Sequence, residues 1–218
     1  MIKITTADLF DSYGIAEQLF RECMYPWQII PLIREYAMRL TENMPEGYVR
    51  LCEGVIVGDN VRIDKSATVI GPTVIGADSE IRPGAYIRGS VIIGKGCVVG
   101  NSSEVKNAIL LDGAQIPHFN YVGDSILGNR AHLGAGAICS NLKSDKSSVA
   151  IHANSNIDTG LRKLGAILGD GAEIGCGCVL NPGTIVGKGC AVYPLTSLCG
   201  IYPPNSIVKS KNNIVERE

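Results

Sequence analysis

Aliphatic residues recur along most of this chain at a spacing of six. The first run has ten such positions: Val57, Ile63, Val69, Ile75, Ile81, Ile87, Ile93, Val99, Val105 and Leu111. A second run comprises Leu168, Ile174, Leu180, Val186, Val192 and Leu198. A period of six differs from the 3.6 of an amphipathic helix and from the two of a simple strand. The pattern therefore indicates a repeat architecture.

Small residues stand two positions before most of these sites, and glycine often follows them. A large aliphatic residue fills a core, a small one lets the wall close in, and glycine permits a tight corner. Three such walls per turn predict a triangular prism of parallel strands, stacked at about 4.8 Å. This is the hexapeptide pattern, and over about residues 55–206 the chain resembles the left-handed parallel β-helix proteins. The left-handed sense is implied by that resemblance.

We expect an all-β solenoid in three segments. Residues 1–50 are predicted to form a small helical cap, because apolar residues over 6–44 recur at helical spacing and Pro31 can open a helix. Residues 51–206 are predicted to form the β-helix with a loop excursion over 140–160, and 207–218 a charged tail. A segment as short as the first cannot hold a core alone. We expect it to cap the first coil or to contact another copy, and a pair of partner-docking helices remains open.

Composition narrows the classes of partner. The 218 residues carry a net charge of −1, and no long basic run supports nucleic-acid binding. No apolar run reaches membrane length and the N-terminus does not resemble a secretory leader, so a cytoplasmic protein is expected. Cys97, Cys178 and Cys190 fall at small-residue positions, and the cysteine spacings do not match a zinc site. We expect reduced, structural cysteines and no metal.

The repeat is predicted to slip at Pro117 and to break between Cys139 and about Arg162. Loops thrown out from a solenoid often carry function. His118 lies at the slip, and a neutral imidazole suits proton abstraction, although an ordinary surface histidine remains the alternative. Arg88 and Lys106 are 18 residues apart and should share a corner of successive coils. Two cations about 5 Å apart with no obvious carboxylate favour a bound anion such as phosphate, and the alternative is two solvated cations.

Three motifs extend the resemblance. They are GNSSEVKN from Gly100, PHFNYVGD from Pro117 and LGAGAICSN from Leu133. These stretches resemble the acetyltransferase domain of bifunctional N-acetylglucosamine-1-phosphate uridyltransferases. The segments SNLK from Ser140 and TGLRKLGA from Thr159 resemble more closely the archaeal-type sugar-1-phosphate nucleotidylyltransferase/acetyltransferases. That family transfers acetyl from acetyl-CoA to the amine of glucosamine-1-phosphate.

The resemblance assigns roles by position. It implies that His118 is the general base. It implies that sugar-phosphate contacts come from Arg88, Lys106, Tyr121, His132 and Lys146. His132 stands where the family has an asparagine, and Lys146 is one residue out of step with the family's loop lysine. Contacts to acetyl-CoA are implied for Ala135, Asn141, Leu142 and Cys176, with the Ala135 N–H facing the thioester oxygen.

The resulting hypothesis is a homotrimeric, acetyl-CoA-dependent N-acetyltransferase of an amino-sugar phosphate. No glycine-rich nucleotide loop precedes residue 55, so we expect no nucleotidyl transfer from this chain. Alternatives left open are a non-catalytic trimeric scaffold or regulatory protein and an O-acyltransferase acting on a nucleotide sugar. A metal hydratase of the γ-carbonic-anhydrase type is disfavoured, because the three histidines of the chain lie too far apart in sequence for its metal ligands.

Overall fold

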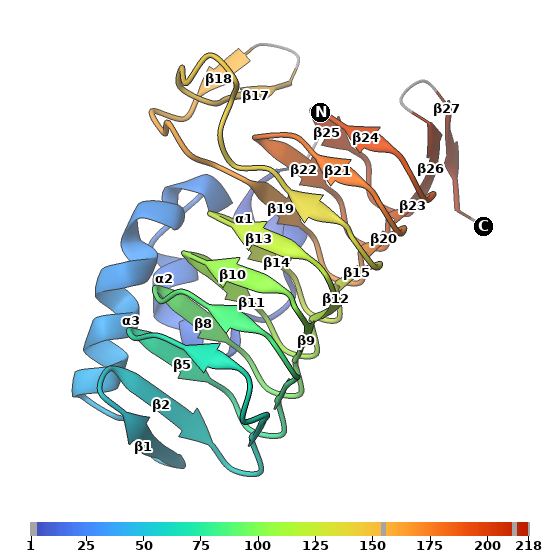
Figure 1. The fold of residues 1–218 in the computed structure, drawn as a ribbon. Helices are drawn as coiled ribbons and strands as arrows, with labels where there is room; N and C mark the ends of the chain where they lie inside the picture. The colour runs from blue at the N-terminus through green and yellow to red at the C-terminus, as the bar shows by residue number, and fades with distance from the viewer. Residues whose placement is uncertain (1–3, 154–155, 211–212, 218) are drawn as a thin grey trace.

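The computed structural model describes residues 4–153, 156–210 and 213–217. Its strands wind into a prism with three walls, each a stack of short parallel strands (Figure 1). The fold is the parallel β-helix that the six-residue pattern predicts, of the left-handed kind that the resemblance implies. Within the described residues, no helix is both long enough and apolar enough to cross a membrane.

The strands divide among the walls as follows. The first wall contains β1 (Tyr48–Cys52), β2 (Val55–Gly58), β5 (Thr73–Ile75), β8 (Val91–Ile93), β11 (Ala108–Leu110), β14 (Ile126–Leu127), β19 (Ala166–Leu168), β22 (Thr184–Val186) and β25 (Ile201–Tyr202). The second wall contains β3 (Arg62–Ile63), β6 (Glu80–Ile81), β9 (Val98–Asn101), β12 (Gln115–His118), β15 (His132–Leu133), β20 (Glu173–Ile174), β23 (Ala191–Val192), β26 (Ser206–Ser210) and β27 (Asn213–Glu216). The third wall contains β4 (Thr68–Val69), β7 (Tyr86–Ile87), β10 (Glu104–Lys106), β13 (Tyr121–Gly123), β16 (Ile138–Cys139), β21 (Val179–Leu180) and β24 (Ser197–Leu198).

The predicted aliphatic positions fill the inside of the prism, with one correction. Leu110, and not Leu111, pairs with Ile93 on the first wall and joins the inner core. Leu111 lies outside the prism, in the apolar layer beneath the helices. The slip therefore precedes Leu110. The repeat keeps its inward aliphatic residue beside Pro117, because Ile116 is fully buried in the inner core.

All departures from six-residue spacing in the described core fall on one edge of the prism, between the third and first walls. Along this interrupted edge, the step from Val105 to Leu110 and the step from Val122 to Leu127 are each one residue short. The excursion that follows Cys139 leaves from the same edge. It contains a small antiparallel hairpin of β17 (Ala150–His152) and β18 (Asn156–Asp158), which projects from the prism in Figure 1.

The N-terminal segment lies along the side of the prism and not across its first coil (Figure 1). It comprises α1 (Thr6–Leu9), η1 (Gly14–Ala16), α2 (Glu17–Arg21), η2 (Pro26–Gln28), η3 (Ile30–Leu32) and α3 (Ile33–Glu42). Its apolar side chains pack on an outward row of the first wall: Ile56, Val74, Ile92, Ile109, Ile126, Ile167 and Ile185. This placement corrects the expectation that the segment caps the first coil. The helices share one core with the wall.

Antiparallel strands finish the two ends of the stack. At the start, β1 pairs with β2, and at the other end β27 pairs with β26. These strands cover ladder groups that a bare terminal coil would leave unpaired. The residues predicted as a charged tail thus begin within a terminal hairpin.

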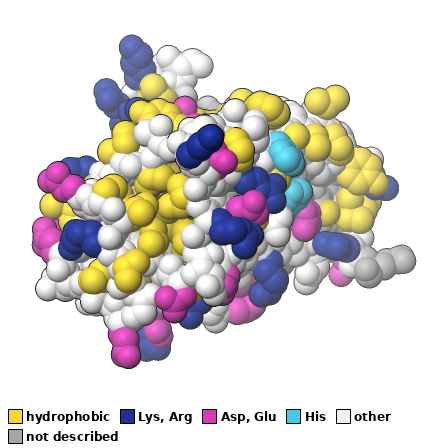
Figure 2. All heavy atoms as spheres, turned by 60° about the horizontal axis from the view of Figure 1, so that its bottom comes forward, with side chains coloured by type: hydrophobic (Ala, Val, Ile, Leu, Met, Phe, Trp, Pro, Cys, Tyr) yellow, Lys and Arg dark blue, Asp and Glu magenta, His cyan; other side chains and the backbone are white. Residues whose placement is uncertain are grey.

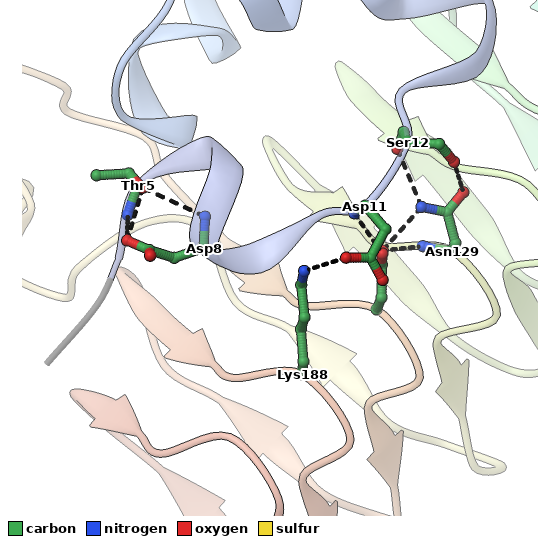
Figure 3. Close-up of polar contacts among 7 residues, drawn as sticks. Thr5, Asp8, Asp11, Ser12, Asn129 and Lys188 are labelled. Carbon is green, nitrogen blue, oxygen red and sulfur yellow. Dashed lines mark hydrogen bonds and ion pairs between the residues drawn. The ribbon is translucent and has the colours of Figure 1, made fainter.

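Polar contacts fix the N-terminal segment to the prism (Figure 3). The buried Asp170 carboxylate accepts hydrogen bonds from the backbone of Asn129 at 2.6 Å and of Asp11 at 2.7 Å. The Asn129 side chain donates to the Ser12 carbonyl at 3.0 Å, and Lys188 reaches the exposed Asp11 carboxylate at 2.5 Å. These contacts, which we call the clamp, join three neighbouring coils to the segment between α1 and η1.

All eight cysteines are free thiols. Five are buried, including the three at small-residue positions, and three are exposed: Cys52, Cys176 and Cys199. Burial raises the pKa of Cys97 and of Cys139 to about 12. These two thiols therefore stay protonated and act as small apolar side chains.

Candidate active site

His118 belongs to a row of residues stacked along the edge between the second and third walls. The row consists of Asn101, His118, Ala135 and Cys176, and we call it the histidine row. Backbone bonds show the stacking: Phe119 N donates to Asn101 O at 2.9 Å, Gly136 N to His118 O at 3.0 Å and Gly177 N to Ala135 O at 2.8 Å. The proposed base and two of the residues expected at acetyl-CoA thus lie on successive coils of one edge.

A buried asparagine holds this row together. Asn120, which is 2 % exposed, accepts from the His118 N–H at 3.1 Å and donates to the carbonyls of Gly134 at 2.8 Å and Ala137 at 3.2 Å. It therefore joins the backbone of His118 to the turn that contains Ala135. The His118 side chain itself is exposed to solvent. Within the described residues, no backbone acceptor pairs with the Ala135 N–H.

Close packing at the next coil requires glycine beside His118. A Cβ on Gly100 would lie only 1.6 Å from the Pro117 carbonyl oxygen. The backbone of Gly100 has an ordinary φ, so this requirement comes from the contact alone. Pro117 and His118 follow in the same strand, β12, which rests directly on β9. Gly100 thus allows β12, and with it His118, to pack closely against β9.

Arg88 and Lys106 share a corner of successive coils, as the sequence predicts, and lie on the interrupted edge. The expectation that no carboxylate lies near these two cations is wrong. Glu104 Oε1 lies 2.7 Å from Arg88 Nη1. This hydrogen bond raises the pKa of Arg88, desolvation opposes it, and the Glu104 charge adds to the rise. Lys106 is half-buried and has no ion pair within the described residues. The positive charge free to meet an anion is therefore mainly that of Lys106.

Tyr121 connects the two edges across the third wall. It begins β13, three residues after His118, and its hydroxyl lies near the far end of the same strand, at Gly123. Burial raises the Tyr121 pKa, the charges of Asp124 and Glu104 raise it further, and a hydrogen bond from Asn141 opposes the shift. The phenol therefore keeps its proton at neutral pH.

The remaining predicted residues lie around this wall. His132 is on the second wall, where its Nδ1 lies 3.0 Å from Glu173 Oε2. Lys146 is exposed in a turn of the excursion, and its N–H donates to the Lys143 carbonyl at 3.0 Å. The structure thus places His132 on β15, paired with Gln115 of the strand that ends at His118, and Lys146 in the excursion.

Leu142 lines a cleft of about 440 Å³ between the excursion and the last coils. The polar residues that line this cleft include Lys143, Asp145, His152, Asn181 and Cys199. Figure 2 shows basic and acidic side chains grouped beside exposed histidines, with hydrophobic side chains on either side of them. Within the described part of the chain, no group of three or more metal-ligating side chains comes together.

Comparison with known proteins gives matches to sugar-nucleotide enzymes. Residues 69–160 match the family model described as GMPPB C-terminal domain. Bifunctional protein GlmU of Methanococcus vannielii is 29% identical over 154 residues, covering 69% of this chain and 37% of that protein. The chain resembles part of the GlmU proteins. A bifunctional sugar-1-phosphate nucleotidylyltransferase/acetyltransferase of Sulfurisphaera tokodaii is 33% identical, covering 78% of this chain and 43% of that protein.

These matches confirm the resemblance expected from the three motifs. The chain spans less than half the length of the curated relatives it matches. Among solved structures, UDP-N-acetylglucosamine acyltransferase from Campylobacter jejuni is similar with a TM-score of 0.54 and 19% identity, covering 75% of this chain and 71% of that one. That likeness supports the β-helix fold.

Sequence reasoning missed three residues that organise the site. Asn120 and Glu104 lie inside the quoted motifs, yet neither received a role. Asp124 closes the PHFNYVGD motif, and its side chain contacts Asn141. A signal was available for Glu104, because residues two apart on a strand share a face and Glu104 stands two before Lys106.

Proposed function

We propose that this chain is an acetyl-CoA-dependent acyltransferase that N-acetylates an amino-sugar phosphate, with His118 as the general base. The observation that carries the proposal is the histidine row, in which the His118 carbonyl accepts from Gly136, directly after Ala135. This stacking puts a proton acceptor and a backbone donor on neighbouring coils. The similarity to GlmU proteins and to a bifunctional sugar-1-phosphate nucleotidylyltransferase/acetyltransferase supports the same reaction class.

The proposed reaction is direct transfer. The acceptor amine attacks the thioester carbonyl carbon while His118 takes the amine proton. The Ala135 N–H stabilises the oxyanion of the tetrahedral intermediate, which collapses with cleavage of the C–S bond. Coenzyme A leaves as the thiolate and the acetyl group ends on nitrogen. Lys106 and Arg88 would hold the sugar phosphate, with Arg88 exchanging part of its contact with Glu104.

A homotrimer is the proposed assembly. The outer face of the third wall exposes large apolar side chains, with Tyr86 at 40%, Ile138 at 39% and Val179 at 36%. An exposed apolar strip beside a candidate site fits contact with a second copy. Light scattering should give three times the 23.1 kDa chain mass, and a monomer at micromolar concentration would contradict this assembly. The cytoplasmic location stays a prediction.

The decisive experiment measures free thiol released from acetyl-CoA with a panel of amino-sugar phosphates that includes glucosamine-1-phosphate. His118→Ala should lower kcat by about 10²- to 10⁴-fold with little change in KM for acetyl-CoA. Gln115→Ala, an exposed position on the same strand, is the matched control and should behave as wild type. Unchanged turnover in His118→Ala would remove this histidine from the mechanism. Absence of release with every acceptor would favour a scaffold.

A further inference from the structure

Asp124 stands between two asparagines on neighbouring coils of the interrupted edge. Its carboxylate is 5 % exposed; Oδ1 accepts from Asn107 Nδ2 at 2.8 Å, and Oδ2 accepts from Asn141 Nδ2 in a close contact. Asn107 Nδ2 also donates to the Ile30 carbonyl at 3.3 Å, so the N-terminal segment helps to fix this group. We call Asn107, Asp124 and Asn141 the corner ladder.

The ladder determines which end of the Asn141 amide faces outward. A carboxylate only accepts hydrogen bonds, so Asn141 must turn its amino group toward Asp124. Tyr121 occupies the same side: a Cβ on Gly123 would lie 2.5 Å from the Tyr121 hydroxyl and 2.7 Å from Asn141 Nδ2. Both N–H bonds of Asn141 thus face Asp124 and Tyr121. Its Oδ1 has no hydrogen-bond partner within the described residues.

We propose that Asp124 is a positioning residue that locks the Asn141 amide, so that Oδ1 is presented as an acceptor for an N–H of the bound ligand. The inference rests on the proposed function, because it assigns to Asn141 the recognition of a ligand N–H within that site. Two reactants carry suitable N–H groups: the amine of the acceptor sugar and the amides of the pantetheine arm of acetyl-CoA. The shared chemistry is an N–H donor, and kinetics distinguish its source.

Asp124→Asn tests the orientation with almost no change of shape. Asn107 would still donate to Oδ1 of the new side chain, leaving the new amino group facing Asn141. The Asn141 amide must then turn over to accept, and it shows an amino group to the ligand. We expect kcat/KM to fall roughly 10- to 100-fold, because a donor then faces a donor. The substrate whose KM rises identifies the N–H that Asn141 reads.

A purely structural role predicts a different result. Every group of the ladder remains paired in Asp124→Asn, so its urea midpoint should stay near that of wild type. Asp112→Asn is the matched control, because the Asp112 carboxylate likewise accepts a hydrogen bond from a neighbouring coil, from the Lys95 N–H at 2.8 Å, but lies outside the site. That control should keep wild-type kinetics. Equal losses of stability and activity in Asp124→Asn would overturn the proposal.

The exchanged pair gives the sharpest test. Asn141→Asp alone sets two carboxylates against each other and should be poorly active. In the double variant D124N/N141D, the amide at 124 donates to the carboxylate at 141, whose second oxygen again faces outward as an acceptor. We expect the double variant to recover at least about ten-fold in kcat/KM over Asp124→Asn. A double variant no better than either single one would refute the orientation argument.

A neutron structure separates this inference from the proposed function. Deuterium positions on the Asn141 amide should point to residue 124 in wild type and away from it in Asp124→Asn. The same orientation in both proteins would overturn the inference even if the chain is an acetyltransferase. If wild type releases no coenzyme A with any acceptor, the proposed function fails, and the neutron comparison still decides the orientation.

Discussion

Removing the Asp170 carboxylate should loosen the N-terminal segment from the prism. Asp170→Ala leaves two backbone N–H groups without their acceptor, those of Asn129 and Asp11. Each orphaned donor costs about 1–3 kcal/mol, so the total should be about 2–6 kcal/mol. With m values of about 2–3 kcal/mol per molar, the urea midpoint should fall by roughly 1–3 M.

Trp27 provides a local probe for this experiment. It is the single tryptophan of the chain, is 4% exposed and lies in the N-terminal segment. Its fluorescence reports docking of the helices, whereas far-UV circular dichroism reports mainly the β-helix. We expect Asp170→Ala to shift the fluorescence transition at least as far as the circular dichroism transition, because neighbouring parts of a solenoid can unfold separately.

The matched control is Asp11→Ala. It removes the exposed ion pair with Lys188 but keeps the Asp11 N–H bond to Asp170. Exposed pairs contribute about 0–1 kcal/mol, so its midpoint should move far less. Equal shifts in the two variants would show that the buried carboxylate does not dominate the clamp, and the reasoning from orphaned donors would be wrong.

Three further predictions follow from packing and titration. At pH 8 a thiol reagent should label the three exposed cysteines in the native protein, while Cys97 and Cys139 react only on unfolding. Mass spectrometry identifies the labelled residues, and label on Cys97 or Cys139 in the native protein would contradict this prediction. The Lys188 hydrogen bond lowers the pKa of Asp11, so its small stabilisation is present above the unfolded value of 3.8 and is lost as pH falls through the folded pKa. Melting temperatures of wild type and Asp11→Asn should therefore differ slightly at pH 5 and converge toward pH 2, and divergence in acid would contradict this. Gly100→Ala places a Cβ 1.6 Å from a carbonyl of the next coil, so it should lower both Tm and turnover, and an unchanged Tm would contradict the contact.

The six-residue period was sufficient to predict the prism, because the inward positions alone define it. It could not locate the slip. Leu110 and Leu111 are both aliphatic, so a spacing of six fits Leu111 while the fold uses Leu110. The deciding feature is the short corner at Asn107, whose φ of 45° lies in the left-handed region. A backbone conformation of this kind leaves little trace in a hydrophobic pattern.

The sequence does contain a signal for the position of the helices. In first-wall strands an aliphatic residue also stands immediately before the inward one, as in Ile56 before Val57 and Ile92 before Ile93. Strands that are apolar on both faces are covered on both faces. Most of the corresponding positions on the second wall are polar, such as Arg62 and Glu80. Comparing the walls would have predicted helices along the first wall in place of a cap.

Only part of the candidate site was predicted, because some of its residues carry a signal in motifs or in the repeat and others do not. His118 was proposed from the expected slip of the repeat and from motif resemblance, and Ala135 from the resemblance alone. The coil arithmetic correctly placed Arg88 beside Lys106. The arithmetic compared only residues of one corner, so it overlooked Glu104, which reaches Arg88 from within the wall. Buried polar groups such as Asn120 were missed because their partners are backbone atoms of other coils.

The candidate site spans two edges of the prism, and the interruptions of the repeat lie on only one of them. The short steps, the excursion and the corner ladder all belong to the interrupted edge, where Asn107 and Asp124 take positive φ values of 45° and 48°. His118 lies on the regular edge across the third wall. The regular edge carries the proposed general base, and the irregular edge carries the polar groups that we propose contact the ligand. Tyr121, which begins near His118 and ends beside Asn141, joins the two. Inserting one residue beside Asn107, which would restore six-residue spacing between Val105 and Leu110, should therefore disturb ligand recognition before it disturbs the proposed base.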